Sequence, residues 1–68
     1  MAILKVIEIM ASSTISWEDA VKNAVQAASK TVKGIRSVYV QDQSATVVDG
    51  EVKEFRVTTR ITFEVFEH

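Results

Sequence analysis

The 68-residue chain has no cysteine and one histidine, His68, which excludes disulfides and argues against a zinc or haem site within one chain. A formal net charge of −1, with Lys and Arg scattered among acidic residues, argues against nucleic acid or an anionic membrane surface as a partner. A domain this small usually needs stabilisation beyond its own core, from a disulfide, a metal or a partner subunit. Because 47% of its residues are hydrophobic, the composition predicts association with other copies of the chain.

Residues 1–68 are expected to form one domain, since so small a core cannot be divided into two folding units. Residues 2–10 are rich in Ile, Leu and Val and predict a first strand with apolar side chains on both faces. The core of a secretion signal is uncharged, whereas Lys5 and Glu8 interrupt this stretch. No uncharged apolar run is long enough to span a membrane. We therefore expect a cytoplasmic protein. Residues 12–14 predict a loop.

A single amphipathic helix is predicted next. Ser16 and Asp19 have the spacing with which a helix start satisfies its free amide groups. Apolar residues then recur at steps of three and four, as expected for one buried face: Trp17, Ala20, Val21, Ala24, Val25, Ala28 and Val32. Lys33 and Gly34 favour a helix end near residue 33, with the glycine in a left-handed cap.

Two further strands are predicted, over residues 35–47 and after residue 51, joined by a tight turn at Asp49 and Gly50. In the last strand, polar residues alternate with apolar ones that are expected to meet the helix: Phe55, Val57, Ile61, Phe63 and Val65. The predicted fold is therefore α+β in β-α-β-β order, a three-stranded antiparallel sheet that wraps one helix. If the first strand lies antiparallel beside the last one, the last strand is in the middle, the helix covers one face of the sheet, and the opposite, polar face is exposed in a monomer.

With this order in place, three stretches resemble the dodecin family: KVIEI at residues 5–9, TISWEDA at residues 14–20 and VDGEVKEFRVT at residues 48–58. The resemblance covers essentially the whole chain. It implies a hollow homododecamer in which each sheet wraps its own helix. Many dodecins bind flavins in pairs at subunit contacts, where a tryptophan of the second strand stacks on the ring and a glutamine of the third strand binds its edge.

The family's two flavin positions fall on Ser37 and Arg56, so neither the tryptophan nor the glutamine is present. Aromatic stacking contributes on the order of 0.5–1.5 kcal/mol beyond burial, so the resemblance implies a weakened site for FMN or a riboflavin-like flavin. Tyr39, two residues beyond Ser37, completes the predicted ligand-binding set with Gln41 and Thr58. The alternative for Tyr39 is a contact between subunits.

Two other groups of residues have open interpretations. Arg56, Thr58 and Arg60 share one face of the last strand, where guanidinium groups can bind a phosphate or carboxylate. The alternative is that these arginines pair with Glu54, Glu64 or carboxylates of a neighbouring subunit. Trp17 lies on the helix stripe, which indicates packing in the core or an interface rather than ligand stacking.

The missing tryptophan and the stretch from Ser16 to Glu18 resemble the subgroup described as calcium dodecins. Calcium takes about six to eight oxygen ligands, and the chain lacks the local acidic loop that supplies them in EF-hands. A calcium site would therefore be assembled from scattered oxygens, for which the sequence offers four unranked donors: Glu18, Asp19, Asp42 and Asp49.

The chain is predicted not to be an enzyme, because it has no cysteine, no internal histidine, no phosphate-binding glycine loop and no nucleophile-elbow serine. Adjacent acids at the helix start are explained by capping. Two functions remain. The first is a storage protein that holds a flavin or another anionic small molecule between subunits, and the second is a calcium-binding shell without flavin.

Overall fold

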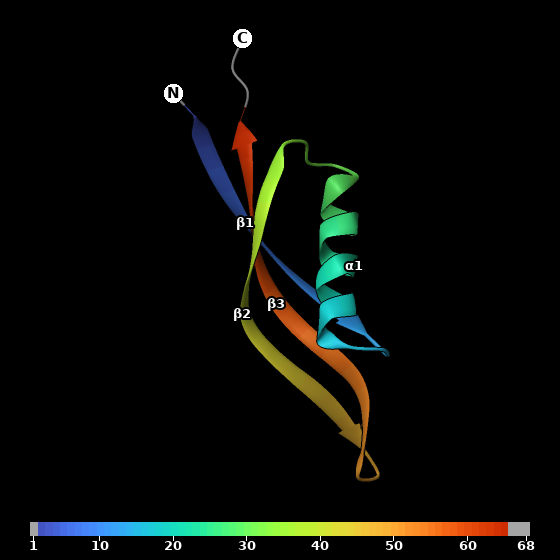
Figure 1. Ribbon diagram of the computed structural model, residues 1–68. Coiled ribbons are helices and arrows are strands. Elements are labelled where there is room, and N and C mark those ends of the chain that lie inside the picture. Colours follow the sequence, from blue (N-terminus) through green and yellow to red (C-terminus); the bar gives the residue numbers. More distant parts are fainter. Residues whose placement is uncertain (1, 66–68) are drawn as a thin grey trace.

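The structure is a computed structural model that describes residues 2–65. It contains three strands and one helix in the order β1 (Ile3–Ser13), α1 (Trp17–Ser29), β2 (Ile35–Val48) and β3 (Glu51–Val65). Strand β3 lies between β1 and β2, and both pairings are antiparallel. Helix α1 lies along one face of this twisted sheet (Figure 1). The predicted α+β fold and its β-α-β-β order are confirmed.

The core between α1 and the sheet is small because the helix faces the sheet with alanines. Ala20, Ala24 and Ala28 recur every four residues on one side of the helix and are 0%, 1% and 4% exposed. On β3, Val57 and Ile61 are 2% and 0% exposed. Methyl side chains let the helix lie close to the sheet, but each buries little apolar area. A single chain therefore gains only modest stability from this core.

The helix begins where the sequence predicted and ends earlier. Ser16 is the N-cap, and its hydroxyl accepts a hydrogen bond of 3.0 Å from the amide of Asp19. The helix ends at Ser29, with Lys30 as its C-cap, so the predicted end near residue 33 is wrong. Gly34 has a positive φ of 78° but lies immediately before β2, and its carbonyl accepts a hydrogen bond from Glu64 of β3. Its left-handed conformation directs the chain into the sheet rather than closing the helix.

Strand β1 extends through Ser12 and Ser13, two residues that the sequence assigned to a loop. Both pair with β3, and Ser13 is buried at 7% exposure. The Ser13 hydroxyl donates a hydrogen bond of 2.6 Å to Oδ2 of Asp19 and accepts one of 2.9 Å from the amide of Ile15. These tertiary contacts fix the end of the strand and the start of the helix, and composition alone does not reveal them.

The β2–β3 hairpin turns at Asp49 and Gly50, which have φ angles of 53° and 78°, as predicted for a tight hairpin. The pairing of β2 with β3 is not uniform, because the register shifts between Ile35 and Ser37 and again between Val40 and Asp42. A third shift lies between Thr46 and Val47. Each irregularity changes which residues of β2 reach a given face of the sheet.

The protomer is elongated, with extents of 54 × 19 × 13 Å and a radius of gyration of 14.0 Å. A compact chain of this length has a radius of gyration of about 11 Å. In Figure 1 the β2–β3 hairpin projects beyond the N-terminal end of α1, which accounts for part of this length. The accessible surface is 5076 Å², against about 4,300 Å² for a compact monomer of this mass. The folded chain therefore leaves surface that its own core does not cover.

Candidate functional site

The face of the sheet opposite α1, called the outer face below, carries most of the predicted site residues. On β3 the buried residues Val57, Thr59 and Ile61 face the helix, so the residues that alternate with them point to the other side. The outer face of β3 thus presents Arg56, Thr58, Arg60, Thr62 and Glu64. The register adds Leu4, Val6, Glu8, Met10 and Ser12 from β1 and Ser37, Tyr39, Asp42 and Ser44 from β2.

Ser37 and Tyr39 lie on the same face of β2, as their spacing predicted, and this face is the outer one. Ser37 pairs with Thr62, and Tyr39 pairs with Arg60. Tyr39 is 65% exposed, so its side chain is accessible on this face. Glu8 of β1 pairs with Arg60 from the other side, so the arginine lies between a carboxylate and an aromatic ring. An aromatic face next to a guanidinium group suits a planar ligand that carries negative charge.

The strict alternation that predicted Gln41 for this face is interrupted at Gln41 itself. Because the register shifts between Val40 and Asp42, Asp42 rather than Gln41 pairs with Thr58. The bulge therefore brings a carboxylate onto the outer face that alternation would place on the helix side. Sequence reasoning missed this role of Asp42, and no residue in the stretch marks the bulge as glycine would. A ligand contact by Gln41 stays a prediction.

The charged side chains of the outer face are partly paired within the chain. Nη2 of Arg56 lies 3.9 Å from Oε1 of Glu54, whose Oε2 also accepts a hydrogen bond of 3.3 Å from the Ser12 hydroxyl. Glu64 binds Arg36 instead, with Oε1 accepting from Nε at 3.1 Å and from Nη2 at 2.9 Å. The predicted pairing of Arg56 with Glu54 is therefore present but long, and Glu64 pairs with an arginine that the sequence did not single out.

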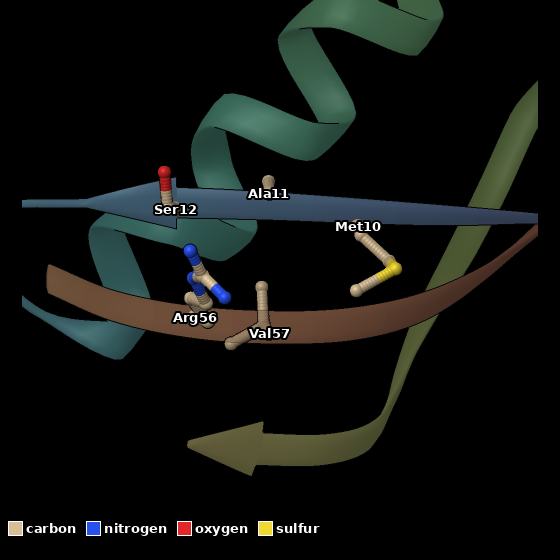
Figure 2. A pocket seen from close by; sticks show the side chains of 5 residues that line it. All are labelled: Met10, Ala11, Ser12, Arg56 and Val57. Atoms are coloured by element: carbon tan, nitrogen blue, oxygen red, sulfur yellow. The ribbon is translucent and has the colours of Figure 1, made fainter. Parts of the chain in front are cut away.

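An open pocket of about 230 Å³ lies over the seam between β1 and β3. It is lined by Met10, Ala11 and Ser12 of β1 and by Arg56 and Val57 of β3. Figure 2 shows the Met10 and Arg56 side chains on either side of Val57. Met10, Ser12 and Arg56 belong to the outer face, so this pocket is part of the same surface as the predicted ligand residues.

Trp17 does not contribute to the outer face. Its indole Nε1 donates a hydrogen bond of 2.8 Å to the backbone carbonyl of Ser44, and its ring meets Phe55 edge to face at a centroid distance of 5.0 Å. Phe55 lies on the same side of β3 as buried Val57, so the tryptophan packs the start of α1 against the helix side of the hairpin. The interpretation of Trp17 as a packing residue is confirmed.

The four predicted calcium donors are distributed over separate elements. Glu18 and Asp19 lie in the first turn of α1, Asp42 lies on β2, and Asp49 lies in the hairpin turn. Asp19 already accepts the Ser13 hydroxyl. Within residues 2–65, no three acidic, histidine or cysteine side chains are grouped closely enough to hold a metal ion, and His68 lies outside the described residues. The described part of one chain therefore does not bring the four predicted donors together.

The dodecin family model matches residues 3–66. The chain belongs to the dodecin family. Dodecins are oligomeric, ligand-binding proteins, in keeping with an exposed outer face that carries both aromatic and charged groups. Calcium dodecin of Mycobacterium tuberculosis is 34% identical over 65 residues, which make up 96% of this chain and 92% of the relative. No helix within residues 2–65 of this dodecin is long and apolar enough to cross a membrane.

Solved dodecin structures share the backbone of this chain. A variant of the Thermus thermophilus dodecin has a TM-score of 0.94 at 25% identity, with 100% of both chains covered. Dodecin from Streptomyces coelicolor has a TM-score of 0.92 at 27% identity, covering 98% of this chain and 96% of that one. The calcium dodecin structure, described as having a calcium-binding site, has a TM-score of 0.81 at 34% identity, covering 94% and 91%. Sequence identity and backbone similarity thus rank these relatives differently.

Proposed function

We propose that this dodecin forms a hollow homododecamer that binds small ligands between subunits and catalyses no reaction. The outer face carries this proposal. Leu4, Val6 and Met10 of β1 are 56%, 54% and 72% exposed, and Tyr39 of β2 is 65% exposed. Apolar residues gathered on one face of a small protein mark an interaction surface. The small alanine core and the excess surface of the protomer favour other copies of the chain as the partner.

The proposed ligand is a flavin, such as the anionic FMN or the neutral riboflavin, or else a different planar molecule that carries negative charge. Tyr39 offers an exposed ring, and Arg60 beside it offers a guanidinium group. Ser37, Thr58 and Arg56 complete the ligand-binding set, with Gln41 next to them in the bulge. Because Ser37 replaces the stacking tryptophan of other dodecins, binding of flavin is expected to be weaker than in members that have both flavin residues.

The absence of catalysis and a cytoplasmic location stay predictions. The first follows from side-chain chemistry, because residues 2–65 contain no histidine, and the Ser13 hydroxyl, which donates to Asp19, has no such general base within that part of the chain. The proposed role is therefore to hold and release a ligand rather than to transform it.

The assembly is tested by native mass spectrometry of the purified protein, alone and with FMN. We expect a mass of twelve subunits that carries flavin adducts after incubation. Val6→Glu places a charge in the apolar part of the outer face and is expected to yield monomers, because an uncompensated buried charge costs several kcal/mol. Ile15→Glu is the matched control, since Ile15 is 73% exposed but lies in the loop before α1. A monomeric wild type, or a dodecamer of the Val6→Glu variant, would contradict the proposal.

Calcium binding at subunit contacts is the second candidate function. It is favoured by the 34% identity to calcium dodecin and by the carboxylates of Glu8 and Asp42 on the outer face. Calorimetric titration of calcium into chelator-treated protein is expected to show binding that Asp42→Asn weakens. Absence of binding heat in the wild type, with the assembly intact, would contradict this alternative and leave the flavin-type ligand.

A further inference from the structure

The pocket between Met10 and Arg56 has the size and the lining of a site for a small amphipathic molecule. Its volume of about 230 Å³ equals that of roughly eight water molecules in the liquid, which is below the range of drug-sized pockets. One end presents the Arg56 guanidinium and the other the thioether of Met10, with Val57 between them (Figure 2). A ligand that fills it would place a charged group at one end and an apolar group at the other.

The guanidinium of Arg56 is available to such a ligand. Its contact with Glu54 is a single long one of 3.9 Å between side chains that are 53% and 41% exposed, and pairs of this kind contribute little to stability. Arg36 makes a useful contrast, because two of its nitrogens bind Glu64 at 3.1 and 2.9 Å. A guanidinium group has five N–H donors, so Arg56 can bind a carboxylate in two-point fashion without giving up its loose contact with Glu54.

The apolar end of the pocket, formed by Met10, also lacks a covering partner within the described chain. Met10 is 72% exposed, although its unbranched thioether is the kind of side chain that adapts its shape to an apolar partner. Val57 lies between the two ends (Figure 2), but its side chain faces the helix and the residue is only 2% exposed, so Met10 is the side chain that offers apolar surface here. A hydrated inorganic ion would use none of this apolar lining, whereas an aromatic ring or a short hydrocarbon chain would cover it.

Glu54 sets the charge of the ligand. Its carboxylate lies beside Arg56 and is also held by the Ser12 hydroxyl at 3.3 Å, so it remains next to any anion bound by the guanidinium. Like charges at this distance repel, and the repulsion doubles for a dianion such as phosphate. The arrangement therefore favours a monoanion.

We infer that the Met10–Arg56 pocket binds a small monocarboxylate with an aromatic or aliphatic body, about the size of benzoate. The inference rests on the proposed ligand-binding function and names the chemical group that this part of the outer face recognises. Arg56 binds the carboxylate, and Met10 contacts the apolar body.

The inference is tested on the full chain in its assembled state by ligand-observed NMR titration with benzoate. Saturable binding is expected for the wild type. Arg56→Gln is expected to weaken it roughly tenfold or more, because a charge-assisted pair is lost, while Arg36→Gln leaves it unchanged. Glu54→Gln is expected to tighten binding by removing the competing carboxylate. Benzyl alcohol, which is neutral and of similar size, and inorganic phosphate are both expected to bind more weakly than benzoate.

Three results would overturn the inference: no benzoate binding to the assembled wild type, equal binding by the Arg56→Gln variant, or phosphate binding more tightly than benzoate. Native mass spectrometry of each variant shows whether the assembly persists. If benzoate binds with the expected variant effects but flavin does not bind, the pocket inference stands and the flavin part of the proposed function fails. If flavin binds and benzoate does not, the reverse holds.

Discussion

Replacing Ile61 by alanine is expected to lower the free energy of unfolding by roughly 2–5 kcal/mol. Ile61 is 0% exposed and is a member of the cluster formed with Ala24 and Ala28 of the helix. Its cross-strand neighbours are Ile7 on β1 and Val38 on β2, so it lies at the centre of the sheet below the helix. The alanines of α1 are too small to fill the space that its side chain would leave, and a cavity would remain.

Urea unfolding at one fixed protein concentration measures this effect, because assembly adds a concentration-dependent contribution to stability. Phe63→Ala is the matched control. Phe63 is a larger residue that lies two positions further along the same side of β3. It pairs with Lys5 of β1 and Ile35 of β2 and is only partly buried. The sequence alone ranked Phe63 with the core, whereas the structure predicts the smaller loss for it. A greater loss in Phe63→Ala than in Ile61→Ala would contradict this assignment of the core.

Introducing tryptophan at Ser37 is expected to strengthen flavin binding by about tenfold or more, which corresponds to 1.4 kcal/mol. Ser37 lies on the outer face opposite Thr62, two positions before the exposed ring of Tyr39. The residue is itself exposed, so a large side chain can be placed there without disturbing the core. The gain would come from stacking of the indole on the isoalloxazine ring together with the apolar area that the contact buries.

Quenching of flavin fluorescence during titration reports this binding directly. Ser37→Leu separates the two contributions, because leucine buries apolar area but has no aromatic face. We expect Ser37→Trp to bind flavin more tightly than Ser37→Leu, and Ser37→Leu to exceed the wild type slightly. Equal affinities for all three proteins, with their assembly intact, would show that Ser37 does not face the ligand.

Features that depend on neighbouring residues were predictable from the sequence. Asp49 and Gly50 tolerate positive φ angles wherever they occur, so the hairpin could be placed without knowledge of the sheet. The same holds for the cap at Ser16, whose partner is three residues away. The alternation along β3 then identified the helix side and the outer face correctly, because that strand is regular between residues 55 and 65 in its pairing with β1.

Features that depend on distant contacts were not predictable. Ser13 belongs to a strand because it pairs with Phe55 and donates to Asp19, and serine itself gives no sign of this. The early end of α1 follows from the need to return to the sheet at Gly34, which a helical pattern of apolar residues does not record. The bulge at Gln41 decides that Asp42 reaches the outer face, and the amino acids around it are ordinary strand residues.

The strand order has a consequence for how the chain folds. Strands β1 and β2 never touch as neighbours in the sheet, because each pairs with β3, the strand that comes last along the described chain. During synthesis no native strand pair can form until β3 emerges from the ribosome. Until then the apolar residues of β1, β2 and α1 stay exposed to solvent. The β2–β3 hairpin then needs only a tight turn, but the pairing of β1 with β3 must close a long loop. Until it does, the nascent chain exposes strand residues that chaperones can shield.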